Sequence, residues 1–423
     1  MLDIKFIREN LDLVKEALRA RNSSINIEEI VELDNQRREL VQKIDSLREY
    51  KNRANEEIKT LLEKKEDISS KIEEMKKVSK ELDEWEAKLR EIKDSLQKKL
   101  LMVPNIPHIS VPRGDVSFNK IIREWGSKRE FDFTPLTHIE LSEHLDIIDF
   151  PRASKICGSN FALFKGKGAK LVRALINFML DLHTTKHNYK EVFPPFLVNR
   201  ASMVTTGQLP NLEEDMYKLK DDDYFLIPTA EVPVTNIHRD DILGEDDLPI
   251  YYVSYTACFR REAGSYGKET KGLTRVHQFD KVELVKFVHP KTSYEELEKL
   301  LADACEVIEL LEIPYRVVFL ATGDMSFAST KCYDIEIYAP GIDRWLEVSS
   351  CSNFEDFQAR RGNIRYRDKL TRKLEFVHTL NGSGVALARL IVAILENYQN
   401  KDGSITLPTV LRPYYDGKTR IEN

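Results

Sequence analysis

Residues 30–62 read IVELDNQRRELVQKIDSLREYKNRANEEIKTLL, and their apolar positions decide the fold of the first part of the chain. Apolar residues alternate at spacings of three and four, with Arg37 and Lys51 at the two remaining positions: Ile30, Leu33, Leu40, Ile44, Leu47, Ala54, Ile58 and Leu61. This spacing is typical of the seam of a coiled coil. No glycine or proline occurs before Pro104, so no strong helix breaker interrupts the first 103 residues.

The same spacing resumes after the polar stretch 64–67, at Ile72, Met75, Val78, Leu82, Trp85, Leu89, Ile92 and Leu96. Two helices of similar length joined by a short polar turn predict an antiparallel coiled-coil hairpin. At about 1.5 Å per residue, residues 31–63 would form an arm on the order of 50 Å long, too long to fold into a compact core. We therefore predict a helical domain over residues 1–103, with a projecting arm over about 30–100.

The charge of the arm leaves its partner open. Residues 31–100 contain 18 Lys/Arg and 18 Asp/Glu, a balance that favours a protein-binding coiled coil. A neutral average can also conceal a basic face, which a rigid arm could present to the phosphates of a folded RNA. The residues that could line such a face are Arg37, Arg38, Lys51, Arg53, Lys64 and Lys65.

A different composition begins at residues 103–107 (VPNIP), which are followed by Pro112 and Gly114. This cluster predicts a domain boundary. Beyond it, strand-like runs at 251–259, 276–288 and 345–350 alternate with helical patterns at 167–187, 293–312 and 384–399. We therefore predict an α+β domain over residues 104–423, built around an antiparallel sheet.

Composition excludes several classes of protein. The 423 residues include 64 Lys/Arg and 70 Asp/Glu, and no apolar run approaches the roughly 18 residues of a membrane span. The start, MLDIK, lacks the basic n-region of a signal peptide, so we predict a soluble, cytoplasmic protein with no membrane partner. Five scattered cysteines without zinc-ligand spacing predict free, mostly buried thiols and no zinc.

Two arginine-bearing segments could bind phosphate. Residues 257–262 (ACFRRE) precede a loop at 263–274 rich in Gly, Ser, Lys and Thr, after which RVHQF resumes at 275–279. This order predicts a strand, a mobile loop and a returning strand, with arginines whose forked guanidinium groups can hold phosphate oxygens. The alternative is an exposed hairpin with ordinary surface charges.

The second segment, residues 376–389 (FVHTLNGSGVALAR), predicts a strand that runs through a glycine turn into an apolar helix. Arg389 stands among Ala, Leu, Ile and Val, and a buried arginine needs an anion. A dinucleotide-binding fingerprint is the alternative, but its third glycine would fall at Leu387. Only 34 residues follow Arg389, too few to complete the sheet of such a domain, so we exclude hydride transfer.

A third segment, residues 346–350 (LEVSS), places Glu347 and Ser350 three residues apart near a strand end. Such oxygen ligands suit Mg²⁺ shared with substrate phosphates, although a strand end capped by a serine is the alternative. With residues 228–231 (PTAE), these segments contain no Ser-His-Asp or Cys-His nucleophile. Chemistry that rests on positioned cations and Mg²⁺ predicts transfer at a nucleotide phosphate.

At this point the sequence resembles the bacterial type of seryl-tRNA synthetases, which are class II aminoacyl-tRNA synthetases, over essentially the whole chain. Residues 167–195 resemble the first class motif, at a dimer interface, and residues 259–279 and 382–389 resemble the second and third. The stretches FRREAGS (259–265), HQFDKVE (277–283) and EVSS (347–350) are more specific to the serine enzymes. Two departures are Ala388 in place of a glycine and an arm tip without glycine.

The resemblance implies an ATP site in which Arg260 binds the α-phosphate and Arg275 and Arg389 bind the γ-phosphate. Arg260 and Arg389 would be catalytic. The adenine would contact Glu262 and Val276 and stack on Phe279, and Mg²⁺ would be held by Glu347 and Ser350. The implied ATP site comprises Arg260, Arg261, Glu262, Arg275, Val276, Phe279, Glu347, Val348, Ser349, Ser350 and Arg389.

The resemblance also implies a serine pocket formed by Thr229, Ala230, Glu231, Arg260, Glu283, Asn381 and Ser383. Two carboxylates suit a substrate with an ammonium and a hydroxyl group, and which one binds which group stays open. The implied activity is a homodimeric ligase that forms seryl-adenylate from serine and ATP and transfers the seryl group to the 3′ end of serine tRNA. Selenocysteine tRNA would be a second substrate where the organism has one, and the arm would bind the long variable arm of the tRNA.

Two other functions are considered. A relative that loads a small amino acid on a carrier protein would have no use for the intact arm. A catalytically inactive scaffold would not need the chemical positions, all of which are intact. The zinc-dependent form of this synthetase is disfavoured by the missing ligand pattern and by the character of the arm.

Overall fold

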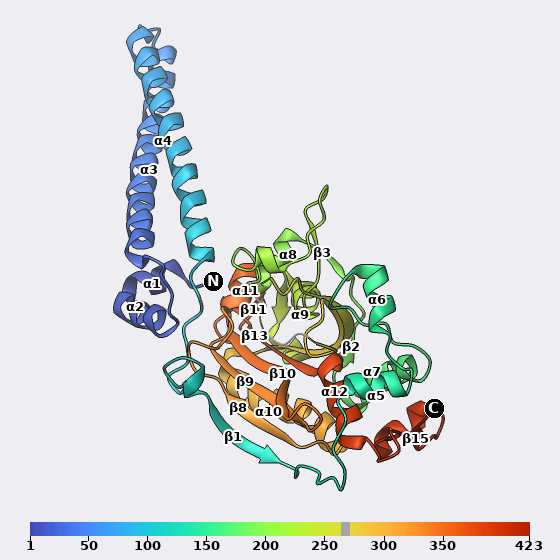
Figure 1. Ribbon diagram of the computed structural model, residues 1–423. Coiled ribbons are helices and arrows are strands. Elements are labelled where there is room, and N and C mark those ends of the chain that lie inside the picture. Colours follow the sequence, from blue (N-terminus) through green and yellow to red (C-terminus); the bar gives the residue numbers. More distant parts are fainter. Residues whose placement is uncertain (264–270) are drawn as a thin grey trace. The chain divides into compact units, whose positions relative to one another are not determined.

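The computed structural model describes residues 1–263 and 271–423, which form two compact units, Met1–Pro104 and Asn105–Asn423 (Figure 1). Helices dominate the first unit, whereas the second combines helices with a large sheet, which confirms the predicted α+β fold. Most of the predicted mobile loop at 263–274, together with Gly264 and Ser265, lies outside the described residues.

The first unit consists of α1 (Ile4–Glu9), α2 (Leu11–Ala20), α3 (Ile27–Glu63) and α4 (Ser69–Leu101). Helix α3 begins where the Asn26 side chain accepts hydrogen bonds from two backbone amides of the first turn. Three ion pairs join the two helices: Glu29 with Lys99, Lys43 with Glu81, and Glu57 with Lys71. The residue numbers increase along α3 while those of their partners decrease along α4, so the two helices are antiparallel. The predicted long antiparallel hairpin is thereby confirmed.

The interface between α3 and α4 follows the predicted apolar positions except Ile72, which is 40% exposed, and it includes one charged member. Its buried members include Ile30, Leu40, Ile44, Ala54, Met75, Leu82, Ile92 and Leu96. The charged member is Asp34, whose side chain is 0% exposed and forms ion pairs with Arg8 and with Arg37, the latter at 2.7 Å. Arg37 therefore interrupts the apolar seam because it neutralises a buried carboxylate at the base of the arm.

The tip of the arm turns without glycine. Lys65 adopts the left-handed conformation, with φ of 58°, and the amide of Glu66 donates to the carbonyl of Leu61 at 3.0 Å. The Asp67 carboxylate accepts from the amide of Ser69 at 2.9 Å and so stabilises the start of α4. A lysine thus takes the position that glycine commonly holds after a helix.

The second unit is built on an eight-stranded sheet with the order β1-β8-β9-β10-β13-β7-β6-β2. Neighbouring strands are antiparallel except β2 and β6, so the predicted antiparallel sheet is confirmed. Its strands are β1 (Lys120–Trp125), β8 (Tyr315–Phe319), β9 (Lys331–Ala339), β10 (Arg344–Glu355), β13 (His378–Ala386), β7 (Gln278–Val288), β6 (Ile250–Phe259) and β2 (Lys190–Glu191).

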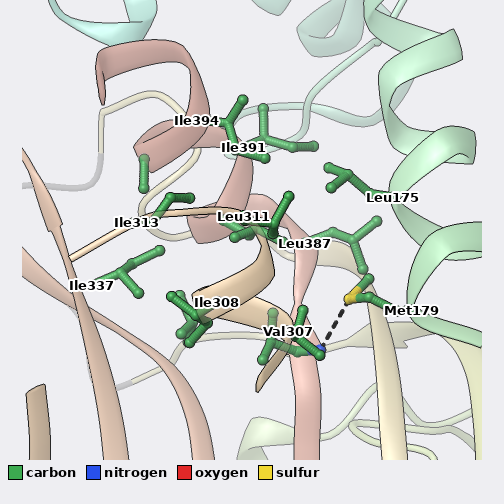
Figure 2. Close-up of a cluster of buried hydrophobic side chains, with 14 of the residues drawn as sticks. Leu175, Met179, Val307, Ile308, Leu311, Ile313, Ile337, Leu387, Ile391 and Ile394 are labelled. Carbon is green, nitrogen blue, oxygen red and sulfur yellow. Dashed lines mark hydrogen bonds between the residues drawn. The ribbon is translucent and has the colours of Figure 1, made fainter. Parts of the chain in front are cut away.

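Three amphipathic or apolar helices cover this sheet: α7 (Lys167–Thr185), α10 (Ser293–Leu310) and α12 (Leu387–Tyr398). Figure 2 shows their side chains meeting in one buried cluster, with Leu175 and Met179 from α7, Val307 from α10, and Leu387 and Ile391 from α12. These helices match the three helical patterns predicted from the sequence, apart from their ends. Within the described ranges, we find no helix with the length and apolar character of a membrane span.

The remaining elements are short. The helices are α5 (His138–His144), α6 (Phe150–Cys157), α8 (Arg200–Thr206), α9 (Glu231–Thr235) and α11 (Phe357–Gly362). The strands are β3 (Leu197–Asn199), β4 (Tyr224–Leu226), β5 (Ile242–Gly244), β11 (Arg365–Arg367), β12 (Leu374–Phe376), β14 (Ile405–Thr406) and β15 (Arg420–Ile421). Single 3₁₀ turns occur at Val116–Phe118, Glu213–Asp215, Asn236–His238, Glu245–Asp247, Pro290–Thr292, Thr409–Leu411 and Pro413–Tyr415.

The prediction of a glycine turn between the last long strand and the helix that follows it, at residues 376–389, is wrong. Strand β13 continues through Gly382 and Gly384 to Ala386, and α12 begins at the next residue. A Cβ atom on Gly382 would lie 2.8 Å from the Cys351 sulfur, and one on Gly384 would lie 2.6 Å from the His183 ring. These glycines therefore serve close packing within a strand, which the sequence pattern does not distinguish from a turn.

Candidate active site

A cavity of about 610 Å³ in the second unit brings together side chains from β7, β10, β13 and α12 and from the segments that follow β4 and β6. Its lining includes most of the site residues predicted from the sequence: Thr229, Glu231, Arg260, Glu262, Arg275, Val276, Phe279, Glu283, Glu347, Val348, Ser350, Asn381, Ser383 and Arg389. The segments that carry them are far apart in the sequence, and the antiparallel sheet places them in one site.

Three predicted residues do not line the cavity. Ala230 is 0% exposed and packs in a separate apolar cluster with Val234 and Tyr252. The Ser349 hydroxyl is buried and donates to the backbone carbonyl of Ser383 at 2.6 Å. Arg261 is exposed, and its backbone amide donates to the Asp215 carbonyl. Successive side chains of an extended chain point to opposite sides, so neighbours of a site residue commonly face away.

Arginine side chains give the cavity a cationic wall. The Arg389 guanidinium donates to the carbonyl of Glu347 at 2.7 Å and to that of Thr274 at 3.3 Å. Its side chain is 29% exposed, so the expectation of a buried Arg389 is wrong, because the cavity leaves one side of the group open. Two backbone carbonyls fix the orientation of the Arg389 guanidinium group, which can still bind an anion.

The other two arginines of the wall are also held in place. Arg275 forms an ion pair with Glu262 at 2.9 Å, and Arg260 donates from Nε to the carbonyl of Pro228 at 3.3 Å. The Arg260 guanidinium also lies 5.2 Å from the centre of the Phe279 ring. Three arginines in the lining of one cavity favour an anionic ligand.

Two buried carboxylates, Glu231 and Glu283, lie in the same cavity at 8% and 2% exposure. The Gln358 amide donates to Glu231 at 2.6 Å. Burial, and to a lesser degree the charge of Glu283, raise the pKa of Glu231 to about 7. Glu231 therefore has neutral hydrogen-bond donors, and the nearby Lys281 charge only partly offsets the effect of burial, as in a site for a cationic ligand.

Lys281 is a cavity residue to which the sequence analysis assigned no role. Its side chain is 7% exposed, donates to the Thr229 hydroxyl at 2.8 Å and forms an ion pair with Glu283. Lys281 and Glu283 stand two apart on β7 and so share a face of the strand. The signal in the sequence was a lysine two residues before a glutamate, within a strand that also contains Val282, Leu284 and Val285.

Gln208 and Gln358, which flank Glu231, were also missed. Neither glutamine lies in one of the segments that the sequence marks as reactive by its arginine, acidic or glycine residues. Gln358 lies on α11 and accepts from the Thr379 hydroxyl at 2.7 Å, which fixes the orientation of its amide. A glutamine on a short helix carries no periodic or motif signal that would identify it from sequence alone.

Acidic groups lie near the cavity on β9 and β10. Asp334 stands opposite Ser350 in the strand register, and burial together with the charge of Glu347 raises the pKa of Asp334 well above its usual value. A hard cation would relieve this repulsion and would find oxygen donors in Glu347 and Ser350, which line the cavity. In the described ranges, no three His, Cys, Asp or Glu side chains gather to hold a metal by themselves.

The comparisons with known proteins first define the class. Residues 217–398, which contain most of the cavity, match the tRNA synthetase class II core domain (G, H, P, S and T). The second unit therefore has the fold of a class II aminoacyl-tRNA synthetase. Residues 1–107 match the seryl-tRNA synthetase N-terminal domain.

Individual relatives narrow the class to one family. A serine–tRNA ligase of Thermodesulfovibrio yellowstonii is 59% identical over 98% of each chain, and one of Carboxydothermus hydrogenoformans is 54% identical over 98% of each chain. The crystal structure of seryl-tRNA synthetase from Pyrococcus horikoshii complexed with ATP matches with a TM-score of 0.93 and 39% identity, covering 100% of this chain and 99% of that one. The chain belongs to the seryl-tRNA synthetase family.

Proposed function

We propose that this chain is a serine–tRNA ligase that activates L-serine with ATP and transfers the seryl group to the 3′ end of serine tRNA. Family membership supports the reaction as a whole. The observation that carries it is the cavity itself, in which three arginines share one site with two buried carboxylates and a buried lysine. The arginines suit a nucleotide triphosphate, and the carboxylates suit an amino acid with a polar side chain.

In the first step, a serine carboxylate oxygen would attack the α-phosphorus of ATP, and the bond from that phosphorus to the bridging oxygen would break to release pyrophosphate. Arg260 would stabilise the charge that develops on the α-phosphate, because the Pro228 carbonyl and the Phe279 ring fix its guanidinium. Arg275 and Arg389 would hold the γ-phosphate. In this assignment the adenine contacts Glu262 and Val276 and stacks on Phe279.

The carboxylates can be given separate roles. Glu283 already has the Lys281 ammonium as a partner, so its charge is balanced before serine arrives. Glu231 is hydrogen-bonded by the neutral amides of Gln358, Gln208 and Asn381. We therefore assign the serine ammonium to Glu231 and the serine hydroxyl to Glu283, with Thr229, Asn381 and Ser383 completing the pocket.

Glu347 and Ser350 would hold Mg²⁺, and their oxygen donors on the cavity wall fit such a hard cation. Mg²⁺, when bound, would neutralise negative charge on the phosphate oxygens. The Arg389 guanidinium contacts both the carbonyl and, at 3.4 Å, the carboxylate of Glu347. The same arginine would therefore hold phosphate and orient the carboxylate that faces it.

The test of activation is serine-dependent exchange of labelled pyrophosphate into ATP by the purified chain. We expect exchange with serine and Mg²⁺ and a much lower rate without serine. Exchange that another amino acid supports better than serine would reject the assignment. Exchange with serine but without Mg²⁺ at an undiminished rate would reject the proposed metal site alone.

The raised pKa of Glu231 predicts how serine binding depends on pH. Below about pH 7 the free protein carries a protonated Glu231, and an ammonium ligand favours the ionised form, so binding must release a proton. We expect the dissociation constant of serine to be about tenfold higher at pH 6 than at pH 8. Calorimetric titration across this range measures it.

The Glu231→Gln variant is the control for this pH dependence. It removes the titrating group while keeping an amide of similar shape, so its serine affinity should be lower and nearly constant between pH 6 and pH 8. A wild-type protein whose serine affinity does not change over this range would contradict the assignment of the ammonium to Glu231.

We further propose that α3 and α4 bind the long variable arm of serine tRNA, and of selenocysteine tRNA where present, and that the ligase acts as a cytoplasmic homodimer. The match of residues 1–107 to the N-terminal domain of this family supports the first part. Within this unit, Arg38, Arg53, Lys64 and Lys65 are at most partly buried and available for phosphate contacts. Four basic side chains suit recognition of the phosphate backbone and the shape of a tRNA.

Shortening the arm should separate activation from transfer. The Lys43 Nζ atom lies 3.5 Å from the Glu81 Oε1 atom, so these two residues face each other across the two helices. A short glycine-rich turn can therefore join residue 43 to residue 81 while the base of the arm stays intact. We expect serine-dependent pyrophosphate exchange to stay within about twofold of wild type. Charging of tRNA should fall by about 10²-fold in kcat/KM, as the loss of a few phosphate contacts would predict.

A full-length control is the triple variant Arg53→Ala, Lys64→Ala, Lys65→Ala, which keeps the helices but removes three positive charges. A partial loss of tRNA charging that is largest at low salt and shrinks as the salt concentration rises would identify phosphate contacts. If the shortened chain charges tRNA as well as the wild type, the arm does not bind tRNA. If it also loses exchange while the catalytic unit stays folded, the arm contributes to activation.

A further inference from the structure

The backbone of residues 273–276 forms part of the cavity wall and carries Arg275 and Val276. Two side chains, those of Arg389 and His138, form hydrogen bonds with the backbone of adjacent residues in this segment. The Arg389 Nε group donates to the carbonyl of Thr274 at 3.3 Å, and the amide of Leu273 donates to Nε2 of His138 at 3.2 Å. His138 is not part of the cavity lining or of the predicted site, and its ring is 1% exposed.

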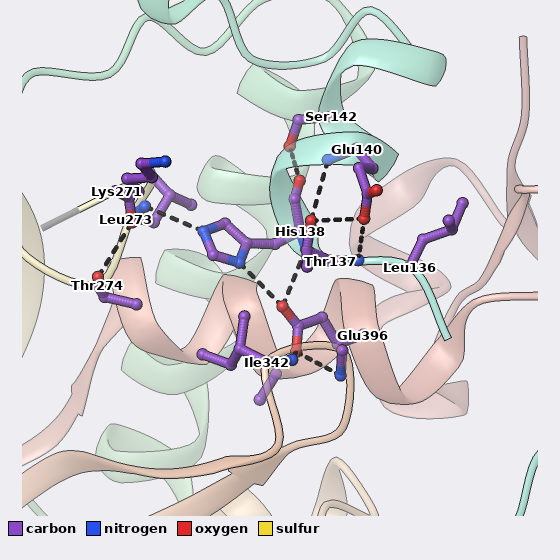
Figure 3. Close-up of polar contacts among 12 residues, drawn as sticks. Leu136, Thr137, His138, Glu140, Ser142, Lys271, Leu273, Thr274, Ile342 and Glu396 are labelled. Atoms are coloured by element: carbon purple, nitrogen blue, oxygen red, sulfur yellow. Dashed lines mark hydrogen bonds and ion pairs between the residues drawn. The ribbon is translucent and has the colours of Figure 1, made fainter. Parts of the chain in front are cut away.

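The hydrogen bonds of His138 fix its tautomer (Figure 3). A backbone amide can only donate, so Nε2 must be unprotonated to accept from Leu273. The hydrogen therefore resides on Nδ1, which donates to the Glu396 carboxylate at 2.9 Å. The imidazole thus connects a carboxylate on one side to the backbone of the cavity wall on the other.

Glu396 is itself fixed. It is 0% exposed, and its two oxygens also accept from the amides of His138 at 2.9 Å, Gly341 at 2.8 Å and Ile342 at 3.2 Å. Glu396 lies on α12, seven residues after Arg389 and so about two turns further along the same helix. One helix thereby holds the segment twice, directly through Arg389 and indirectly through Glu396 and His138.

A glycine next to this contact provides independent evidence. Gly272 has a φ of +69°, and a Cβ atom on it would lie 2.1 Å from Nε2 of His138. The chain therefore packs directly on the edge of the ring, and only glycine fits. Such close contact makes the ring position and the backbone position at Leu273 dependent on each other.

We propose that His138, oriented by Glu396, is a positioning residue that sets the distance between the two phosphate-binding arginines. The role of these arginines rests on the proposed function. Arg389 is fixed to α12, whereas Arg275 follows Leu273 by two residues and would move with its backbone. Loss of the His138 contact would therefore weaken the grip on ATP and leave the serine pocket unchanged.

Two isosteric variants test the contact with Leu273. In His138→Asn the amide takes the place of Nδ1 and can still donate to Glu396, but nothing reaches Leu273. In His138→Gln the side-chain carbonyl can take the place of Nε2 and accept from Leu273. We expect the asparagine variant to raise the KM for ATP about five- to tenfold, as the loss of one hydrogen bond would, with the KM for serine within about twofold of wild type. The glutamine variant should stay within about twofold for both.

A pair of glycine variants controls for backbone strain. Gly272→Ala places a methyl group on the His138 ring, whereas Gly158→Ala pays a similar cost, at a φ of +92°, and its Cβ would meet nothing within 4 Å. Only the first should raise the KM for ATP. The proposal would be overturned if His138→Asn and His138→Gln had equal effects on the KM for ATP. It would also be overturned if the changes in KM and kcat across all variants followed their thermal stability alone.

Hydrogen exchange tests the contact without relying on activity. The amide of Leu273 should exchange about tenfold faster in His138→Asn than in wild type, and should stay protected in His138→Gln. Unchanged protection in the asparagine variant would contradict the role of His138. An absence of serine-dependent pyrophosphate exchange in the wild type would instead reject the proposed function and leave this contact testable.

Discussion

Alanine should be activated about 10⁴–10⁵-fold less efficiently than serine, and threonine should be the more frequent error. A pocket built to bind a hydroxyl group leaves buried polar atoms unpaired when the hydroxyl is missing, and such pockets discriminate by this factor. Glu283 is 2% exposed, and Ser383 approaches it at 3.4 Å, a long hydrogen bond that a better donor could replace. Alanine would place a methyl group against the Glu283 carboxylate, whose Oε2 atom would keep only Lys281 and Ser383 as partners.

Threonine is rejected for a different reason. It keeps the hydroxyl and adds one methyl, so its exclusion depends on steric overlap with Thr229 and Ser383, which are 5% and 7% exposed. Overpacking of this kind costs about 1–3 kcal/mol, or roughly 5- to 150-fold. Steady-state pyrophosphate exchange with serine, threonine and alanine measures both ratios. If alanine is activated more readily than threonine, hydroxyl recognition by Glu283 is not the basis of specificity.

Replacement of Arg260 by alanine should lower serine-dependent pyrophosphate exchange by about 10²–10³-fold in kcat, the usual effect of removing one preorganised charge from a transition state. Arg260 is the cleaner of the two proposed catalytic arginines to test, because its one described side-chain hydrogen bond is to the Pro228 carbonyl. Arg389→Ala should have an effect of similar size. It would also release the carbonyls of Thr274 and Glu347, so part of its loss would come from the cavity wall.

The matched control is Arg367→Ala, which removes an exposed arginine from β11 outside the cavity. It should exchange pyrophosphate within about twofold of wild type. All three variants should show the same thermal unfolding transition to within a few degrees. A folded Arg260→Ala variant with near-normal exchange would remove Arg260 from the mechanism.

Much of the fold could be predicted because its apolar patterns are long. Residues 30–62 repeat a spacing of three and four over many turns, and the resulting helix extends from Ile27 to Glu63. The strands at 250–259 and 278–288 and the first half of the strand at 344–355 were also found, since apolar residues recur along them. Asp34 and the glycines of β13 could not be predicted, because their reasons lie in partners distant in sequence: Arg8 for the former, Cys351 and His183 for the latter.

The candidate site could be predicted where several reactive residues share a short segment. Arg260 and Glu262 line the cavity, whereas Arg261 between them does not, and Ser350 lines it whereas Ser349 is turned toward the carbonyl of Ser383. A motif covers a whole stretch of residues, and the local backbone path decides which of them face the cavity: the adjacent residues Glu347 and Val348 both line it, at an irregularity in the strand register. Gln358, Lys281 and His138 were missed because each acts through one contact with another segment, which no local pattern records.

The central claim is that one cavity activates serine and that the product is serine tRNA. Incubation of the wild-type chain with ATP, Mg²⁺, labelled serine and unfractionated tRNA tests it most directly, with labelled alanine as the parallel reaction. We predict that serine label accumulates on tRNA as an ester that mild base removes, and that alanine label does not. Formation of seryl-adenylate without any serine label on tRNA would contradict the claim and favour transfer to a different acceptor, such as a carrier protein.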